Sequence, residues 1–148
     1  MAKELIVFRK GIYRMTEKEL SQYYYLKKEI EDLENKLAEL GYGVGAIKWS
    51  LEPKGTALSA SIQEKITELK DLWISRRMDA IETYLKIGNY INTIPEPDIR
   101  LIATYRYLNL LTWDQTAAKL GDGSDRTTVA KKMRKYLKNS HFSHLSMK

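Results

Sequence analysis

Three capping boxes predict where helices begin in this chain, and they constrain its fold more than any other feature. They are Thr16-Glu17-Lys18-Glu19, Ser61-Ile62-Gln63-Glu64 and Thr112-Trp113-Asp114-Gln115. In a capping box, the side chains of the first and fourth residues each accept a hydrogen bond from a backbone N–H that the first helical turn leaves free. Helix starts of this kind, spread along the chain, predict an all-α fold.

The first two boxes open long helices in which apolar residues recur at steps of three and four, as on one face of an amphipathic helix. We expect the first helix to run from Thr16 to a C-cap at Gly41, and the second from Ser61 to about Tyr90. The apolar seams are Tyr23, Leu26, Ile30, Leu33, Leu37 and Leu40 in the first helix, and Ile62, Ile66, Leu69, Trp73, Arg76, Ala80, Tyr84 and Ile87 in the second. Residues 41–60 hold four glycines and one proline and form a long connection.

Two such helices joined by a connection predict a coiled-coil-like helical hairpin over residues 1–94. The seams can pack against each other or against a second copy of the chain. Because two helices alone bury little apolar area, we expect a homo-oligomer, either a dimer or a higher assembly. Residues 1–15, with the apolar run Leu5 to Phe8, carry no pattern that decides between a strand, an arm and a lead-in.

Pro95 and Pro97 end the second long helix and predict a domain boundary, so that residues 95–148 form a second domain. Three short helices are expected in this domain, and the first runs from Pro97 to about Leu110. We expect it to turn inward Ile99, Ile102, Tyr105 and Leu108, with Leu101 beside them, and to turn outward Arg100 and Arg106.

The second short helix begins at the third capping box and ends at Gly121. A polar turn, Asp122-Gly123-Ser124-Asp125, leads into the third helix, from Arg126 to about Lys138. At about 100° per residue, the inner face of the third helix carries Val129, Met133, Tyr136 and Leu137. Its outer face carries Thr127, Thr128, Lys131, Arg134, Lys135 and Lys138, with Lys132 at the margin.

The net charge of the chain is concentrated in the same region. From Ser124 onward there are seven basic residues and one acid, Asp125, so the whole formal charge of +6 falls in this segment and the rest of the chain is neutral. Such asymmetry is typical of a segment that faces a polyanion such as nucleic acid. A solvated basic tail, or a charged surface helix of an ordinary bundle, is the alternative.

A short helix, a glycine turn and a helix that opens with threonines and continues with cations predict a helix-turn-helix domain that binds double-stranded DNA. We expect Thr127, Thr128 and Lys131 to read base edges, because short hydroxyls at the start of a helix can approach them. Longer cations reach phosphates on either side. The complete candidate DNA-binding set is Ser124, Arg126, Thr127, Thr128, Lys131, Lys132, Arg134, Lys135 and Lys138.

The segment TYRYLNLLTWDQTAAKLGDGSDRTTVAKKMRKYL resembles the C-terminal helix-turn-helix of phage transcriptional activators of the RinA/ArpU type, which is similar to region 4 of bacterial sigma factors. The matching pieces are Tyr105-Arg106-Tyr107-Leu108, the helix Trp113 to Gly121, and Ser124-Asp125-Arg126-Thr127 at the start of the basic helix. The turn at Gly121-Asp122-Gly123 is longer than the usual sigma-like turn. The resemblance implies activation of late phage genes in a Gram-positive host.

Composition argues against other classes of protein. The chain has no cysteine and two histidines, so disulfides, thiolate zinc sites and cysteine nucleophiles are excluded and little remains for a metal or a cofactor. No converging set of histidines and carboxylates predicts an enzyme. No segment has the apolar length of a membrane span, and the start of the chain does not fit a signal peptide, so we expect a cytoplasmic protein.

Two further functions remain open at the level of the sequence. A small terminase subunit for phage DNA packaging also joins a helix-turn-helix to coiled helices, although terminases usually carry the DNA-binding part at the N-terminus. A sigma-like factor could contact RNA polymerase through Trp73 or Arg76-Arg77.

Overall fold

The structure, a computed structural model, describes residues 14–41 and 60–146, and the side chains of these residues up to 140. Within these ranges all regular secondary structure is helical, which confirms the predicted all-α class. The predicted run Leu5 to Phe8 and the connection 42–59 lie outside the described residues. The chain forms two compact units, one from Tyr24–Glu82 and one from Met1–Tyr23 together with Thr83–Lys148.

The first predicted helix is present, but it is divided in two. Helix α2 is Glu17–Leu20 and helix α3 is Gln22–Glu39. The capping box at Thr16 forms as predicted: the Glu19 N–H donates to Thr16 Oγ1 at 3.1 Å, and the Thr16 N–H donates to Glu19 Oε1 at 3.2 Å. The division falls at Ser21, whose hydroxyl donates to the Glu17 carbonyl at 2.8 Å, because a serine that bonds back in this way competes with the helical ladder.

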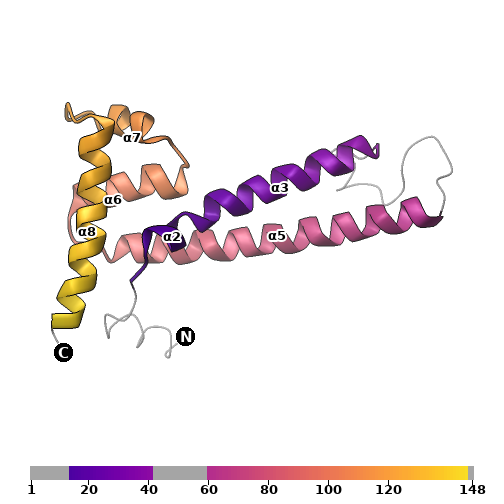
Figure 1. The fold of residues 1–148 in the computed structure, drawn as a ribbon, viewed down its shortest axis with the longest axis horizontal. Helices are drawn as coiled ribbons and strands as arrows, with labels where there is room; N and C mark the ends of the chain where they lie inside the picture. Colours follow the sequence, from indigo (N-terminus) through magenta and orange to yellow (C-terminus); the bar gives the residue numbers. More distant parts are fainter. Residues whose placement is uncertain (1–13, 42–59, 147–148) are drawn as a thin grey trace. The chain divides into compact units, whose positions relative to one another are not determined.

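In the unit Tyr24–Glu82, α3 lies beside the first part of helix α5, Ala60–Asn92 (Figure 1). The two predicted seams meet here, and their buried members are Ile30, Leu33 and Leu37 of α3 and Ile66, Leu69, Trp73 and Ala80 of α5. The Trp73 indole N–H donates to Glu34 Oε2 at 3.1 Å, and Arg76 Nε donates to Glu29 Oε2 at 3.0 Å. Trp73 is therefore buried within this unit and held by a hydrogen bond.

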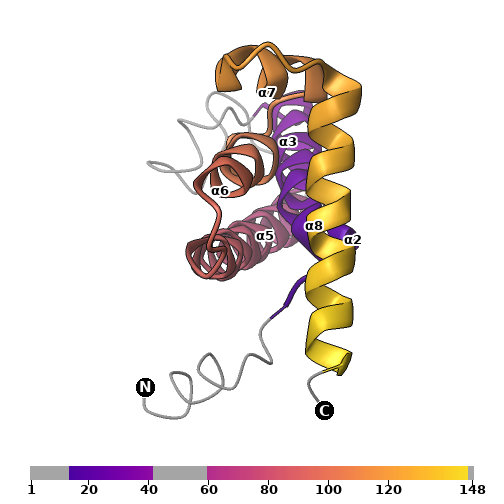
Figure 2. The same ribbon diagram turned by 90° about the vertical axis from the view of Figure 1, so that its left-hand side faces the viewer.

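The second unit contains α2, the end of α5 and four shorter elements in quick succession. These are α6 (Pro97–Ala103), a π-helical turn η1 (Thr104–Leu108), α7 (Trp113–Leu120) and α8 (Arg126–Ser146). Helices α6, α7 and α8 contact one another, and Figure 2 shows α7 leading through its turn into the long α8. Their common core consists of Met15, Leu20, Ile87, Tyr90, Ile91, Ile94, Ile99, Ile102, Ala103, Tyr107, Ala117, Val129 and Met133.

These units differ from the predicted division at residues 94 and 95. Leu20 and Ile87 are fully buried in the same core as Ile102 and Met133, so residues from both sides of the proline pair share one hydrophobic core. The prolines end α5 as expected, but the chain turns back at once and α6 packs against what precedes it. A proline marks the end of a helix and carries no information about which elements share a core.

The first short helix departs from the prediction in its second half. It was expected to be a single α-helix to Leu110, but the π-turn begins at Thr104, where the Asn109 N–H donates to the Thr104 carbonyl at 2.9 Å. Tyr107 is buried there in place of Tyr105, which is half-buried. A π-turn holds an extra residue, so the faces predicted at 3.6 residues per turn rotate beyond it.

The outward orientation predicted for Arg100 and Arg106 is also wrong. Both side chains are half-buried, and both hold backbone carbonyl groups. Arg100 Nη1 donates to the carbonyls of Ile94 and Pro95 at 2.6 and 3.1 Å, and Arg106 Nη1 donates to that of Leu111 at 2.9 Å. These arginines satisfy carbonyl groups that chain reversals and helix ends leave without helical partners.

Candidate nucleic-acid interface

Helix α7 is fixed at both ends by local sequence. At its start the Gln115 N–H donates to Thr112 Oγ1 at 3.1 Å and the Thr112 N–H donates to Gln115 Oε1 at 2.9 Å, which is the predicted capping box. At its end Gly121 has φ +71° and donates its N–H to the Ala117 carbonyl at 3.2 Å. Glycine adopts this left-handed conformation without a steric penalty, so the helix stops here as predicted.

The turn between α7 and α8 is held by two aspartates. Asp122 Oδ1 accepts the N–H of Ser124 at 3.0 Å, and Asp125 Oδ1 accepts the N–H of Thr128 at 2.8 Å. Hydrogen bonds from the side chain and backbone of Ser124 lower the pKa of Asp122, and those from the backbone and side chain of Thr128 lower the pKa of Asp125. Asp125 is thus the charged cap of α8, at the end of the helix that favours negative charge.

The inner face of α8 agrees with the prediction. Val129 and Met133 are fully buried, and Tyr136 and Leu137 are half-buried and pack against the same core. Ala130, which the sequence did not single out, is also buried. Because these residues recur at helical spacing, α8 is held against α6 and α7 in one orientation, and its opposite face is turned to solvent.

The outer face of α8 carries five exposed side chains that fall within one helical stripe. They are Thr127, Thr128, Lys131, Lys135 and Lys138. Among the residues that the structure describes, no carboxylate lies within ion-pair distance of the three lysines, although ion pairs are frequent elsewhere in the same unit. Three cations are therefore turned toward solvent along about two turns of one helix.

The other predicted site residues are engaged within the protein. Arg126 Nη1 lies 3.7 Å from Asp114 Oδ2, Lys132 Nζ pairs with Asp98, and Arg134 Nε lies 3.1 Å from Glu17 Oε2. Ser124, the remaining member, is half-buried in the turn. The hydrogen bond between Lys132 and Asp98 raises the pKa of the lysine and lowers that of the aspartate.

Trp113, the first residue of α7, also belongs to this region. Its half-buried ring lies under two guanidinium groups, Arg106 at 4.7 Å and Arg134 at 5.7 Å from the ring centroid. Cations over an aromatic face are attracted by its quadrupole, and Arg134 is thereby held beside the outer stripe of α8. Local spacing could not predict this arrangement, because the three residues belong to three different elements.

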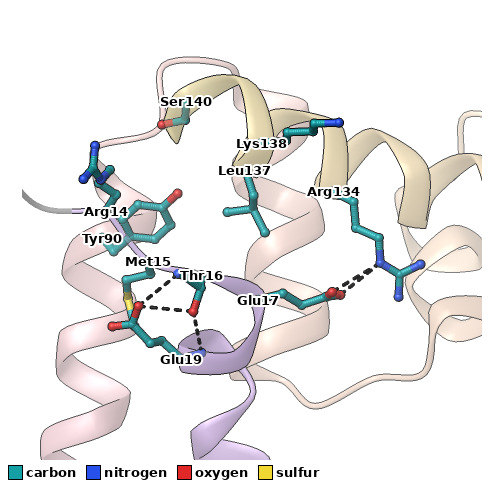
Figure 3. A pocket seen from close by; sticks show the side chains of 10 residues that line it. All are labelled: Arg14, Met15, Thr16, Glu17, Glu19, Tyr90, Arg134, Leu137, Lys138 and Ser140. Carbon is teal, nitrogen blue, oxygen red and sulfur yellow. Dashed lines mark hydrogen bonds and ion pairs between the residues drawn. The ribbon is translucent and has the colours of Figure 1, made fainter. Parts of the chain in front are cut away.

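A cavity of about 600 Å³ lies beside the second half of α8 (Figure 3). Arg134 and its partner Glu17 lie on one side, and Tyr90, Arg14 and Ser140 lie on the other. Burial raises the pKa of the Tyr90 hydroxyl, which stays protonated at neutral pH. The other residues that line the cavity are Met15, Thr16, Glu19, Leu137 and Lys138. The sequence did not predict that residues 14–19 reach α8.

The chain shows no significant match to a family model, to a curated protein or to a solved structure. None of the described helices has an apolar stretch long enough to cross a membrane. Within the described ranges, no group of three or more acidic or histidine side chains is placed to hold a metal ion. The site is therefore characterised by its own geometry: a capped short helix, a glycine turn and a helix with a cationic outer stripe.

Proposed function

We propose that this protein is a sequence-specific, double-stranded DNA-binding transcriptional regulator, acting as a phage-encoded activator of late genes of the RinA/ArpU type in the cytoplasm of a bacterial host. In this proposal α7, the turn and α8 form a helix-turn-helix supported by α6, and α8 is the recognition helix. Helices α3 and α5 form a helical hairpin that serves homo-oligomerisation, and RNA polymerase is a further partner in this proposal. No catalytic step and no cofactor are involved.

One observation carries this proposal: the outer stripe of α8 combines exposed threonines at the N-terminal end with lysines that have no acidic partner among the described residues. Short hydroxyl side chains at the start of a recognition helix approach base edges, and lysines beyond them neutralise phosphates. A helix of an ordinary bundle gains nothing from three unneutralised cations on one stripe, because like charges repel one another.

The cations that are paired with carboxylates can also contact DNA, by exchanging the carboxylate for a phosphate. Arg126, Lys132 and Arg134 are paired with Asp114, Asp98 and Glu17 at the protein surface. Exposed pairs of this kind contribute little to stability, so a phosphate can replace the carboxylate at small cost. We expect Lys131, with Thr127 and Thr128, to set sequence preference, and Lys135 and Lys138 to supply affinity that does not depend on sequence.

The proposal is tested by selecting bound sequences from a random pool of DNA duplexes and measuring binding of variants to the selected site. Thr127→Ala combined with Lys131→Ala should lose the preference for the selected site over random DNA. Lys135→Ala should weaken binding to all sequences alike and lower the slope of log affinity against log salt by about 0.9. Lys65→Ala, at an exposed position of α5 in the other compact unit, is the matched control and should change neither quantity.

If both α8 variants bind as the unchanged protein does, the assignment of α8 as the recognition helix is wrong. A small terminase subunit is the alternative function, and the mass of the protein in solution separates the two. A large ring of subunits would favour DNA packaging, and a dimer would favour a regulator.

A further inference from the structure

The apolar seams from which the sequence predicts self-association pack against each other within one chain. Ile66, Leu69, Trp73 and Ala80 of α5 are buried in a structure that contains one copy of the protein. These seams are therefore not available for packing against a second copy of the chain.

Such a surface exists on the same helix. Ile74, Met78 and Ile81 have relative exposures of 52%, 57% and 53%, and Leu85 continues the same spacing along α5. Their steps of four, three and four place them on one stripe, whose centre lies about a third of a turn around the helix from the centre of the buried face. Single exposed apolar residues are common on proteins, but four in heptad register form a coiled-coil seam. We name Ile74, Met78, Ile81 and Leu85 the α5 stripe.

We propose that the α5 stripe is the interface with a second copy of this chain, and that two α5 helices pair there in parallel. In heptad terms Ile74 and Ile81 take d positions and Met78 and Leu85 take a positions. The stripe is bounded by Asp71 at the preceding a position and Gly88 at the following d position, so it spans about two heptads. The interface is therefore short and buries little apolar area. For this reason the dimer should dissociate on dilution.

The charged residues beside the α5 stripe favour a second copy of the chain as the partner, and they favour a parallel over an antiparallel pair. Arg77 takes the g position and Glu82 the e position five residues later, and both are exposed. In a parallel pair, the g residue of one helix lies beside the e residue of the next heptad on the other helix, so Arg77 of each copy faces Glu82 of the other. An antiparallel pair brings g beside g and e beside e, and it forms neither ion pair.

The two ion pairs are available because both partners are free of competing pairs within the described residues. Arg76, the neighbour of Arg77, is held by Glu29 and Asp79, whereas Arg77 itself only stacks on the Trp73 ring, 4.8 Å from the centroid. The Arg77 side chain is exposed, so its guanidinium group can reach an acidic side chain of a second copy.

The test is sedimentation equilibrium of the full-length protein over a range of concentrations. Unchanged protein should be a dimer that dissociates on dilution, and Ile81→Glu should be a monomer throughout. Leu72→Glu places the same substitution on an exposed residue of a different face of α5 and should remain dimeric. Because both positions are exposed, circular dichroism should show the same helix content for both variants. A monomer at about 0.1 mM, or a dimer of Ile81→Glu, would overturn the proposal.

The orientation is tested by charge exchange. Arg77→Glu alone and Glu82→Arg alone should each raise the dissociation constant of the dimer at least about tenfold, because each places like charges beside one another. Mixing the two variants should restore dimers, since every g–e' contact is then between opposite charges. If mixing restores nothing, the parallel pairing is wrong.

The absence of cysteine from the chain permits a second test of orientation. In a parallel pair the two Met78 residues occupy facing a positions, so Met78→Cys should form an interchain disulfide under mild oxidation. Asp79→Cys, one residue further and on another face, is the control and should not crosslink. Crosslinking of Asp79→Cys in preference to Met78→Cys would contradict the interface.

The use of this dimer in binding two DNA half-sites rests on the proposed function. A parallel pair brings the C-terminal ends of two α5 helices together, so two α8 helices belong to one assembly. If the proposed function holds, Ile81→Glu should retain sequence preference but bind a two-half-site duplex at least about tenfold more weakly. A wild-type dimer that binds no DNA would overturn the proposed function and leave the dimer interface intact.

Discussion

At the scale of single residues, Thr116 is the clearest conflict between local and tertiary requirements. The side chain is fully buried in α7, and its hydroxyl has no hydrogen-bond partner among the described residues. A hydroxyl buried without a partner loses its hydration and gains nothing in return. Thr112, one turn earlier, carries the same side chain at the helix cap, where its hydroxyl oxygen accepts the Gln115 N–H. The contribution of a threonine here is decided by its position in the fold.

We expect Thr116→Val to raise the free energy of unfolding by about 1 kcal/mol, because valine keeps the shape and removes the unpaired hydroxyl. Urea unfolding followed by circular dichroism measures this change. Thr112→Val is the matched control and should lower the free energy of unfolding by about 1 kcal/mol through loss of the N-cap. A loss of stability in Thr116→Val would show that the hydroxyl has a partner in solution.

At the scale of elements, most helix starts follow from local chemistry, but some helix ends and faces do not. Helix α8, for example, continues to Ser146 instead of ending at about Lys138 as predicted. The capping boxes at Thr16 and Thr112, the stop at Gly121 and the break at Pro95 were all predictable, because each depends on residues close in sequence. The π-turn at Thr104 was not predictable. It buries Tyr107 in the core that α6 shares with α7 and α8, and it brings Arg106 to the Leu111 carbonyl.

The start of α8 should respond to pH through Asp125. Hydrogen bonds from Thr128 lower its pKa below the ordinary value of 3.8, so its contribution to stability is present above pH 3.8 and is lost as the pH falls through the lowered value. Asp125→Asn keeps a cap but cannot titrate. We expect the difference in free energy of unfolding between the unchanged protein and Asp125→Asn to shrink as the pH falls below 3.8. Urea unfolding between pH 7 and about pH 2.5 tests this. A difference that does not depend on pH would contradict the cap.

At the scale of the whole molecule, the unit that carries α8 is assembled from distant parts of the sequence. Leu20 is fully buried in the same core as Met133, although more than a hundred residues separate them in the chain. Stability of the candidate DNA-binding surface therefore depends on a leucine in the first predicted helix. Conversely, Leu37, which is also fully buried and belongs to α3, lies in the unit Tyr24–Glu82.

We expect Leu20→Ala to destabilise the unit of α6, α7 and α8 by about 2–5 kcal/mol, because it leaves a cavity in a fully buried site. Hydrogen exchange read by mass spectrometry should show faster exchange in α8. Leu37→Ala is the equivalent truncation in the other unit and should speed exchange in α3 and the first part of α5 instead. Equal effects of the two variants on α8 would show that the units do not unfold separately.

The sequence by itself determined the all-helical class, most helix boundaries and the opposed apolar and cationic faces of α8, because these depend on neighbours within one or two turns of a helix. Only the tertiary structure decided which cations remain unpaired, since Lys132 and Arg134 are neutralised by Asp98 and Glu17 from other elements. It also decided that the predicted seams close on each other and that the α5 stripe stays exposed. Periodicity shows that a helix has an apolar face, but the partner of that face is set by long-range packing, which local spacing does not encode.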